Sequence, residues 1–355
     1  MDESPRVEPL PIGSARIGPG RRPYVVAELS GNHNGSLDRA LAIVDAVADS
    51  GADALKIQTY RPDTITIDAD GPRFRLSDAH QLWGGENLYR LYARAHTPYE
   101  WHKQIFERAR DRGLTVFSAP FDPTAIELLE ELDTPAYKIA SSELVDLPLV
   151  RLAAGTGKPL ILSNGMATLG EIDAAVRAAR GAGCRHLAVL ACTAAYPAPA
   201  ADSNLRRIPV LARALGVPVG LSDHTPGLGV AVASVALGAC LIEKHVTLDR
   251  GDGGVDSTFS LEPAELAALV AETTRAWEAL GDGAVGPTPS ELEGLRFRRS
   301  LYVIEDVRAG DAITRTNVRS IRPAGGLPPD ELETVLGRVF TRDAARGTPL
   351  TWSLL

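Results

Sequence analysis

Residues 217–245 read VPVGLSDHTPGLGVAVASVALGACLIEKH. The stretch holds two short apolar runs that each end in ionisable residues, SDH and EKH, with an alanine- and valine-rich segment of helical length between them. A strand, a helix and a second strand in this order form the repeating unit of a parallel sheet. The stretch therefore predicts two neighbouring parallel strands whose carboxyl ends carry His224 and His245.

The same alternation occurs along most of the chain. Short apolar runs end in polar or ionisable residues, and segments with a helical spacing of apolar residues follow them. The eight predicted strands cover residues 24–28, 54–58, 114–118, 136–139, 159–163, 186–190, 217–222 and 240–245, and a closing helix covers residues 263–280. Eight such units predict an α/β fold of the (β/α)8 TIM-barrel type, with its chemistry at the carboxyl ends of the strands.

The composition is that of a globular protein with a substantial core. The chain has 355 residues, 45% of them hydrophobic, and a formal net charge of -8. An acidic chain lacks the basic face with which proteins replace the counterions around nucleic-acid phosphates. We therefore expect no nucleic-acid partner, and positive charge for a small anionic substrate must be local.

The cysteines and the amino terminus indicate a cytoplasmic protein. Cys184, Cys192 and Cys240 are odd in number, widely spaced and without a CxxC pair, which is typical of chains with reduced thiols. The first residues, MDESP, lack the basic and apolar regions of a signal peptide, and no apolar run approaches the ~18 residues that span a bilayer. We expect a soluble, cytoplasmic chain with no membrane partner.

Two irregular segments divide the chain. Residues 61–98 form a long insertion between the second predicted strand and its helix, and a loop of that length in a compact domain is usually functional. Residues 286–295 belong to a stretch with turn chemistry and predict a linker. The sequence thus predicts a barrel domain over residues 1–285 and a small β-type domain over residues 296–355.

Polar side chains follow almost every predicted strand, and in a barrel they are expected to share one pocket. They are Glu28, Lys56, Gln58, Ser118, Lys138, Ser141, Ser163, Thr193, Ser222, His224, Glu243 and His245. Two lysines and several hydroxyls suit a phosphate, because an ammonium supplies charge and a hydroxyl is an adaptable donor. The chain has neither a P-loop motif nor a GxGxxG motif after its first strand, so a nucleotide cofactor is not expected.

Lys56 and Lys138 lie inside apolar strand runs, where an unpaired charge is costly. Three interpretations are open for them. The lysines hold an anion, or they extend outward between the helices with only their charged ends in water, or one of them has a lowered pKa and forms a Schiff base with a carbonyl substrate. Two lysines at two strand ends favour the anion site over an aldolase with one reactive lysine.

His224 and His245 predict a metal site. Each lies at a strand end and one helix separates them, whereas a lone histidine would more often be a hydrogen-bonded structural residue. No third histidine or cysteine has the spacing of a zinc site, so we expect an octahedral ion such as Mn²⁺ or Mg²⁺, completed by water and substrate oxygens. Such an ion would polarise a carbonyl group.

The segments ELSGNHNG and GDGGVD follow the first and the last predicted strand. Both can be plain turns, because Asn, Asp and Gly are typical turn residues. Glu28, at the start of the first segment, and Asp256, at the end of the second, are the functional candidates there. Asp256 would bind substrate hydroxyls.

Ten segments match those of a known family, in order and over nearly the whole chain. They are AELSGNHNG (27–35), KIQTY (56–60), YKIAS (137–141), GMA (165–167), CT (192–193), YPAP (196–199), GLSDHT (220–225), EKH (243–245), FSLEP (259–263) and RP (322–323). With these segments the chain resembles the sialic acid synthase family, and within it the pseudaminic acid synthases. The resemblance implies a TIM barrel joined to a small C-terminal antifreeze-like (SAF) β-clip domain, in a homodimer whose SAF domains each cap the partner's barrel.

The resemblance also implies an activity and a set of site residues. Members of the family condense phosphoenolpyruvate with an open-chain acylamino hexose, release phosphate and form a nine-carbon 2-keto sugar acid. The residues that would bind phosphoenolpyruvate are Lys56, Lys138, Ser141, Ser163 and Ser222; others that would line the site are Glu28, Gln58, Thr193, Tyr196, Glu243 and Asp256. Arg322 would reach the acylamino group from the neighbouring chain. His224 and His245 would bind the divalent metal, with Mn²⁺ first and Mg²⁺ or Co²⁺ as alternatives. Glu28 is expected to act as the general acid or base for the proton of water or of a sugar hydroxyl, with Glu243 as the second candidate.

The motifs ELS (28–30) and DSTFSL (256–261) resemble the pseudaminic type, which implies a 2,4-diacetamido-2,4,6-trideoxy-altrose acceptor. The positions that depart from the family pattern leave this acceptor open, and they are Ala119, Asn164, Ala191, Ala194, Ala195 and Val255. Lost hydroxyls at Ala119 and Ala194 remove potential donors to a substrate, each worth about 1–3 kcal/mol. N-acetylneuraminate or legionaminate synthase, a Schiff-base aldolase and a non-catalytic sugar-binding barrel remain as alternatives.

Overall fold

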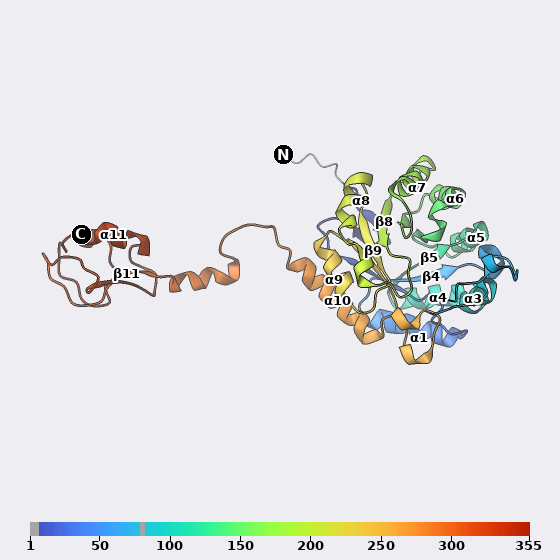
Figure 1. Ribbon diagram of the computed structural model, residues 1–355, viewed down its shortest axis with the longest axis horizontal. Coiled ribbons are helices and arrows are strands. Elements are labelled where there is room, and N and C mark those ends of the chain that lie inside the picture. The colour runs from blue at the N-terminus through green and yellow to red at the C-terminus, as the bar shows by residue number, and fades with distance from the viewer. Residues whose placement is uncertain (1–6, 79–81) are drawn as a thin grey trace. The chain divides into compact units, whose positions relative to one another are not determined.

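The computed structural model describes residues 7–78 and 82–355. The chain forms two compact units, one up to Gly281 and one from Asp282 to Leu355. Figure 1 shows the strands of the first unit surrounded by helices. No helix among the described residues is both long and apolar enough to cross a membrane.

Eight parallel strands of the first unit close into a barrel, which confirms the predicted fold class. They are β3 (Tyr24–Glu28), β4 (Ala54–Thr59), β5 (Thr115–Pro120), β6 (Tyr137–Ile139), β7 (Leu160–Ser163), β8 (Leu187–Cys192), β9 (Val219–Asp223) and β10 (Leu241–His245). β10 pairs with both β9 and β3, and this pairing closes the ring. Each strand overlaps a predicted one, because short apolar runs between helical segments mark both.

A ring of helices covers the outside of the barrel. They are α1 (Leu37–Asp49), α4 (Tyr99–Asp111), α5 (Pro123–Glu131), α6 (Leu147–Gly155), α7 (Leu169–Gly181), α8 (Arg207–Leu215), α9 (Gly229–Ala236) and α10 (Pro263–Glu278). The buried residues of α1 recur at helical spacing and share an apolar core with the strands; they are Ala40, Ile43, Val44 and Val47. Ser36 caps this helix, because its hydroxyl accepts a hydrogen bond from a backbone N–H of the first turn.

A short hairpin that the sequence pattern does not predict closes the amino-terminal end of the barrel. Its strands, β1 (Leu10–Ile12) and β2 (Ala15–Ile17), pack apolar side chains against inward-facing strand residues such as Val26 and Phe117. Strands this short give no clear alternation of apolar and polar residues. Apolar side chains therefore fill this end of the interior, and the polar ones lie toward the other end.

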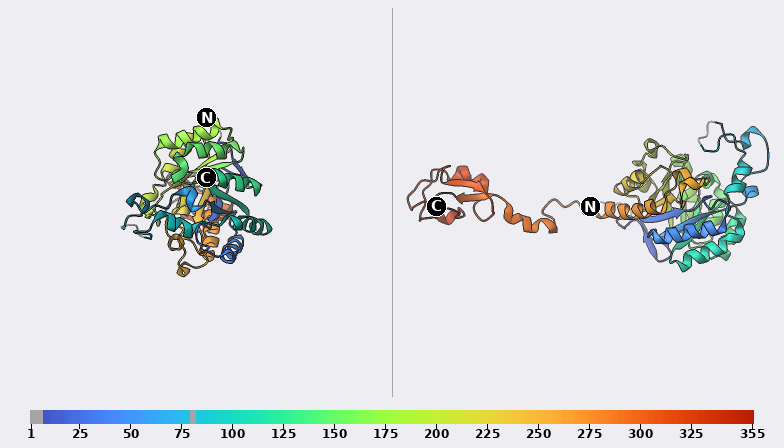
Figure 2. Two further views of the ribbon diagram at one scale, coloured as in Figure 1. Left: turned by 90° about the vertical axis from the view of Figure 1, so that its right-hand side faces the viewer. Right: turned by 90° about the horizontal axis from the view of Figure 1, so that it is seen from below.

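The insertion after β4 carries two short helices, α2 (Pro62–Ile65) and α3 (Leu88–Ala95). In the right-hand view of Figure 2 the insertion, in light blue, lies at the edge of the barrel. Asn87 caps α3 by accepting hydrogen bonds from two backbone N–H groups, and its own amide donates to the Ala69 carbonyl at 2.8 Å. The amino-terminal end of α3 is thus satisfied by a side chain of the insertion itself.

The second unit contains an antiparallel pair of strands, β11 (Ser300–Val303) and β12 (Val318–Ile321), and the short helix α11 (Leu332–Val335). Its separate apolar core includes Leu301, Phe340 and Leu350. Most of the segment predicted as a linker, 286–295, has regular structure, because a 3-10 helix covers Pro289–Phe297. A capping box in which Thr288 and Glu291 exchange hydrogen bonds begins this helix.

Candidate active site

A cavity of about 370 Å³ opens at the carboxyl ends of the barrel strands. The predicted site residues on its wall are Lys56, Gln58, Lys138, Ser141, Tyr196, His224, Glu243, His245 and Asp256. Strand register explains their convergence, because Glu28 of β3 lies beside both Lys56 of β4 and His245 of β10. Residues far apart in the sequence therefore meet at the mouth of the barrel, as this fold requires.

Glu243 lies between the two lysines. Its Oε1 accepts a hydrogen bond from Lys138 Nζ at 3.1 Å, and its Oε2 lies 3.7 Å from Lys56 Nζ. Glu28 completes the group, because its Oε2 lies 2.6 Å from Lys56 Nζ. All four side chains are buried, so two cations and two anions balance each other where little water can reach them.

The ion pairs keep Glu243 and Lys138 charged. Burial alone would raise the pKa of Glu243, but Lys138 and then Lys56 outweigh burial and hold that pKa at about 2. Burial alone would lower the pKa of Lys138, but Glu243 together with Cys192 and Glu28 outweighs burial and raises that pKa. Lys138 is therefore an ammonium ion at neutral pH, which binds anions and is a poor nucleophile.

Hydroxyl groups surround these charges, on the cavity wall or just behind it. Ser222 Oγ donates to Glu243 Oε1 at 3.0 Å, and Ser141 Oγ accepts from the Gly165 N–H at 3.0 Å. Ser163 Oγ is fully buried and has no hydrogen-bond partner. Because a buried hydroxyl without a partner is rare, an oxygen of a bound ligand would suit this position.

His224 and His245 lie side by side at the cavity, with their ring centroids 5.2 Å apart. The Nδ1 of His224 lies 3.0 Å from the carbonyl oxygen of Thr193. Because a carbonyl can only accept, we assign the proton to Nδ1 and a lone pair to Nε2. The Nδ1 of His245 lies 3.5 Å from Asp256 Oδ2. A carbonyl or a carboxylate behind one ring nitrogen is how metal-binding histidines are usually oriented.

These residues fit a divalent metal held by two protein ligands. Each imidazole has one nitrogen beside an orienting group, which leaves its other nitrogen as a ligand. The described part of the chain contains no group of three or more His, Cys, Asp or Glu side chains that could hold a metal ion. Water and substrate oxygens would therefore complete the coordination, which suits an octahedral ion and differs from a structural zinc site.

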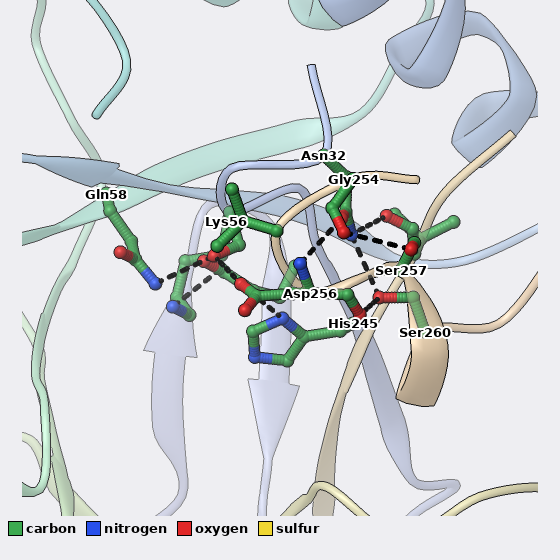
Figure 3. Close-up of polar contacts among 12 residues, drawn as sticks. Asn32, Lys56, Gln58, His245, Gly254, Asp256, Ser257 and Ser260 are labelled. Carbon is green, nitrogen blue, oxygen red and sulfur yellow. Dashed lines mark hydrogen bonds and ion pairs between the residues drawn. The ribbon is translucent and has the colours of Figure 1, made fainter. Parts of the chain in front are cut away.

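Asn32 holds the loop that carries Asp256 (Figure 3). Its side-chain amide donates to the Val246 carbonyl at 2.8 Å and to Ser260 Oγ at 2.9 Å. Its Oδ1 accepts from the Asp256 N–H at 3.2 Å. A Cβ on Gly254 would lie 2.7 Å from that Oδ1, so the close approach requires glycine. The fully buried Asn32 thus ties the loop after β3 to the loop after β10.

Asp256 is also held from the side of β4. The hydroxyl of Ser30 donates to Asp256 Oδ2, and Gln58 Nε2 donates to Ser30 Oγ at 3.3 Å. Figure 3 shows these contacts continuing to His245. These contacts therefore connect Gln58 to His245 through Ser30 and Asp256.

The structure does not place every predicted residue on the cavity wall. Those outside it are Glu28, Ser163, Thr193, Ser222 and Arg322. Thr193 turns away, because its hydroxyl accepts from Arg207 at 2.9 Å, and it contacts His224 only through its backbone carbonyl. Ser118, which is expected in the pocket, also turns away and donates to a backbone carbonyl at 2.9 Å. Arg322 is exposed in the second unit.

The structure adds Glu143, which the sequence analysis does not single out. It lies in the 3-10 helix Ser142–Val145 after β6, two residues beyond Ser141, and it lines the cavity. Burial raises the pKa of Glu143 to about 7, and its Oε2 has no hydrogen-bond partner. A carboxyl group that titrates near neutrality can take up or release a proton. The signal in the sequence is its position just after the strand-end Ser141.

Comparison with known sequences assigns both units. The sequence profile of the NeuB family matches residues 43–285, more than half of the chain. The chain belongs to the NeuB family. The profile of the SAF domain matches residues 298–355, which confirms the predicted type of the C-terminal domain.

Curated NeuB relatives are similar over almost their whole length. The pseudaminic acid synthase of Campylobacter jejuni is 42% identical over 330 residues, which cover 93% of this chain and 96% of that protein. The pseudaminic acid synthase of Helicobacter pylori is 41% identical over the same shares. The N,N'-diacetyllegionaminic acid synthase of Campylobacter jejuni is 35% identical over 91% of this chain and 97% of that protein.

Solved structures of the family share the fold. The N-acetylneuraminic acid synthetase of Leptospira borgpetersenii matches with a TM-score of 0.72 and 32% identity over 81% of this chain and 95% of that one. The spore coat polysaccharide biosynthesis protein SpsE of Bacillus subtilis matches with a TM-score of 0.67 and 30% identity over 98% and 99%.

The positions at which this NeuB chain departs from the family pattern lie only partly on the cavity. Ala119 and Val255 line it. Ala191 is fully buried in the apolar core that the strands share with the helices, so it does not face a substrate. Asn164 accepts a hydrogen bond from the Cys192 N–H at 2.9 Å, which is a structural role. Ala119 and Val255 therefore change the cavity directly.

Proposed function

We propose that this chain is a pseudaminic acid synthase-type enzyme. It joins phosphoenolpyruvate to open-chain 2,4-diacetamido-2,4,6-trideoxy-altrose, releases phosphate and forms a nine-carbon 2-keto sugar acid. One observation carries the proposal: two ammonium groups and a histidine pair share one cavity, so an anion and a carbonyl group can be held side by side. Identity of 41–42% to relatives named pseudaminic acid synthase, against 35% to a legionaminic acid synthase, supports this acceptor over the alternatives.

Lys56 and Lys138 bind the phosphate and carboxylate groups of phosphoenolpyruvate, with the hydroxyls of Ser141, Ser163 and Ser222 around them. The ion pairs of Glu28 and Glu243 hold the two ammonium groups in place before the ligand arrives. An incoming phosphate competes with Glu243 for Lys138. The same ammonium groups stabilise the charge that departs with the phosphate.

The reaction makes one carbon–carbon bond and, from water, one carbon–oxygen bond, and it breaks the carbon–oxygen bond to phosphate. C3 of the enol phosphate attacks the aldehyde carbon, whose oxygen takes up a proton and becomes a hydroxyl. Water adds at C2 and loses its protons as the tetrahedral intermediate expels phosphate with its bridging oxygen and leaves a ketone. Gln58, Tyr196 and Asp256 lie on the wall where they can position the acceptor.

Glu143 is the group we assign to the proton of the attacking water. Its carboxyl titrates near pH 7, and it lines the cavity. Glu28, the first choice from the sequence, is paired with Lys56 and lies off the wall. The pKa of Glu243, at about 2, makes that carboxylate a weak base.

We place a divalent metal on His224 and His245, with Mn²⁺ first and Mg²⁺ or Co²⁺ as alternatives. When bound there, the ion supplies Lewis acidity toward the aldehyde oxygen. The contribution of the chain is orientation, because the Thr193 carbonyl and Asp256 set the two rings. Treatment with a chelator should lower turnover by about three orders of magnitude, and Mn²⁺ should restore it. Unchanged turnover after metal removal would contradict this assignment.

We further propose a homodimer in which the SAF domain of one chain caps the barrel of the other and brings Arg322 to the acylamino group. Arg322 follows β12 and is exposed in its own unit, and no arginine is among the described residues of the cavity wall. Mixing the inactive variants Arg322→Ala and Lys138→Ala should restore activity, because mixed dimers contain one complete site. If confirmed mixed dimers recovered no activity, the proposal that one chain supplies Arg322 to the barrel of the other would be contradicted.

The structure argues against a Schiff-base aldolase, and an assay separates an enzyme from a barrel that only binds sugars. A Schiff-base aldolase needs a neutral lysine, whereas Lys56 and Lys138 are paired with carboxylates. Borohydride treatment with substrates should therefore leave no covalent adduct. Consumption of phosphoenolpyruvate would exclude a barrel that only binds sugars. A cytoplasmic location and the absence of nucleic-acid and membrane partners stay predictions from the sequence.

The decisive experiment is incubation of the full chain with phosphoenolpyruvate, Mn²⁺ and a panel of acylamino hexoses. We expect phosphate release with the 2,4-diacetamido-2,4,6-trideoxy sugar and a nine-carbon acid identified by mass and NMR. Release with N-acetylmannosamine alone would assign the chain to the N-acetylneuraminate type. No release with any acceptor would contradict the proposed function.

A further inference from the structure

One side of the cavity is formed by the insertion after β4, and aliphatic side chains predominate on this side. Trp83 of the insertion lines the cavity, and the other residues, which form the insertion wall, are Ile65, Leu76, Leu88, Leu91, Tyr92 and Ala95. The last four lie on α3 at positions i, i+3, i+4 and i+7, so they form one face of that helix. None of the six carries a charge, and the phenol hydroxyl of Tyr92 is the one polar side-chain group among them.

Two contacts fix the insertion wall against the barrel. A Cβ on Gly31 would lie 3.1 Å from the Ala95 carbonyl oxygen and 3.2 Å from Ala95 Cα, so the end of α3 packs on the loop after β3. Trp83 Nε1 also donates to the Val255 carbonyl at 3.2 Å. The insertion is therefore joined to the loop that carries Asp256, and the wall has a defined place relative to the strand ends.

Another part of the cavity wall carries the charges. Lys56, Lys138 and Glu243 come from the strand ends, and the histidine pair lies with them. The reacting carbon of an open-chain sugar must lie beside these groups, because phosphoenolpyruvate is bound there. The far end of the sugar, C4 to C6, can then reach the insertion, which lines the same cavity.

Two departures of this chain from the family pattern extend the apolar surface. Ala119 and Val255 both line the cavity, and neither has a polar side chain. Phe121, two residues after Ala119, adds an aromatic ring that lies 5.1 Å from the ring of Tyr60. The far end of the acceptor therefore meets few groups that could bond a hydroxyl.

We infer that the insertion wall binds the apolar end of the acceptor, its C6 methyl group and the methyl of its 4-acetamido group, and thereby selects 6-deoxy over 6-hydroxy sugars. The inference rests on the proposed function for the class of the second substrate. A methyl group is stabilised by leaving water, whereas a hydroxyl buried against Leu76, Leu88 and Leu91 loses hydrogen bonds that these aliphatic side chains do not replace. A site of this kind discriminates on the order of 10- to 100-fold.

Binding of unreactive acceptors tests the wall apart from the chemistry. The probes are 2,4-diacetamido-2,4,6-trideoxyaltritol and its 6-hydroxy counterpart, which lack the aldehyde and cannot condense. With the full chain, Mn²⁺ and phosphoenolpyruvate, calorimetry should give a Kd on the order of 10- to 100-fold lower for the 6-deoxy alditol. Equal affinities, a preference for the 6-hydroxy probe, or no binding of either would overturn the inference. Phosphate release from the matching aldoses tests the proposed function separately, so the two failures are distinguishable.

Substitutions on α3 locate the selectivity. Leu88→Gln puts an amide on the insertion wall and should narrow the ratio of the two Kd values about tenfold, because the amide can bond a 6-hydroxyl. Ala93→Gln adds the same amide on an exposed position of the same helix and should leave the ratio unchanged. Leu88→Met keeps the wall apolar and should keep the ratio, which separates polarity from loss of folding. Equal ratios in all three variants would overturn the inference.

Discussion

The two sides of the cavity differ in origin and in chemistry. The strand ends supply the charged side, where each ammonium lies within 3.1 Å of a carboxylate oxygen. The insertion supplies the apolar side, which is seated by a glycine contact and one indole hydrogen bond. We infer that the strand ends of the barrel carry out the reaction and that the insertion selects the acceptor. Changes on each side should therefore alter different kinetic parameters.

Loss of a cation from the charged side should have the largest effect. Lys138→Ala removes an ammonium that would face phosphoenolpyruvate and leaves Glu243 with one fewer partner. We expect kcat/KM for phosphoenolpyruvate to fall on the order of 10²- to 10³-fold. Phosphate release measures the change. Lys103→Ala, on the exposed surface of α4, is the matched control and should leave the rate unchanged. Similar values of kcat/KM for the two variants would contradict the proposal that the charged side of the cavity carries out the reaction.

The pH profile should separate Glu143 from the permanently charged residues. Because burial raises its pKa to about 7, the carboxylate form increases as pH rises through 7, and kcat/KM should rise with it. Glu143→Gln should remove this ascending limb and lower the rate at alkaline pH on the order of 10²-fold. If the rise of kcat/KM with pH persisted in the variant, another group would be responsible for it. Glu100→Gln, exposed on α4, serves as the control.

The raised pKa of Glu143 should make the free energy of unfolding fall with pH, whereas it makes activity rise with pH. The folded chain keeps a proton on Glu143 that the unfolded chain releases near its ordinary pKa of 4.5. The contribution of this group to the free energy of unfolding therefore falls as pH rises from about 4.5 to about 7. Glu143→Gln should flatten the dependence in that window, as urea unfolding at several pH values would show.

The charged side could be predicted from the sequence because it depends on strand ends, which local patterns mark. Which side chains of a strand face the cavity and which face the helices could not be predicted as well. β5 continues to Pro120, two residues beyond the prediction, and with a side-chain period of two Ala119 faces the cavity while Ser118 faces the helices. Thr193 turns away for the same reason, one residue after the inward-facing Cys192.

The apolar side could not be predicted at all from local patterns. The sequence marks the insertion as long, but the placement of α3 over the cavity depends on contacts with residues distant in the chain, such as Trp83 with Val255. The hairpin that closes the other end of the barrel is likewise defined by its tertiary packing. Local alternation thus reveals strand ends, and only the folded chain reveals what covers them.

Asn32 tests how far the geometry of the charged side depends on its supports. Asn32→Asp removes the amide protons that bond Val246 and Ser260 and brings a carboxylate beside a backbone carbonyl. Because the loop that orients Asp256 and His245 loses its tie, Mn²⁺ affinity should fall about 10- to 100-fold. Calorimetric titration with Mn²⁺ measures this. Asn34→Asp, exposed two residues later, should change little. Equal affinities with an altered melting temperature would show a purely structural role.

Gly31 lies where the two sides meet, and its substitution should give the smallest effect. Gly31→Ala pushes a methyl group against the backbone of Ala95, which must move by a few tenths of an ångström and carry α3 with it. Overpacking of this kind costs about 1 kcal/mol of stability. We expect KM for the acceptor to rise roughly threefold, which corresponds to about half of the 1.4 kcal/mol of a tenfold change. KM for phosphoenolpyruvate should stay unchanged. Gly155→Ala, where a Cβ meets no atom within 4 Å, is the matched control. If both KM values rose together, the insertion and the strand ends would act as one unit, and the division between reaction and acceptor selection would not hold.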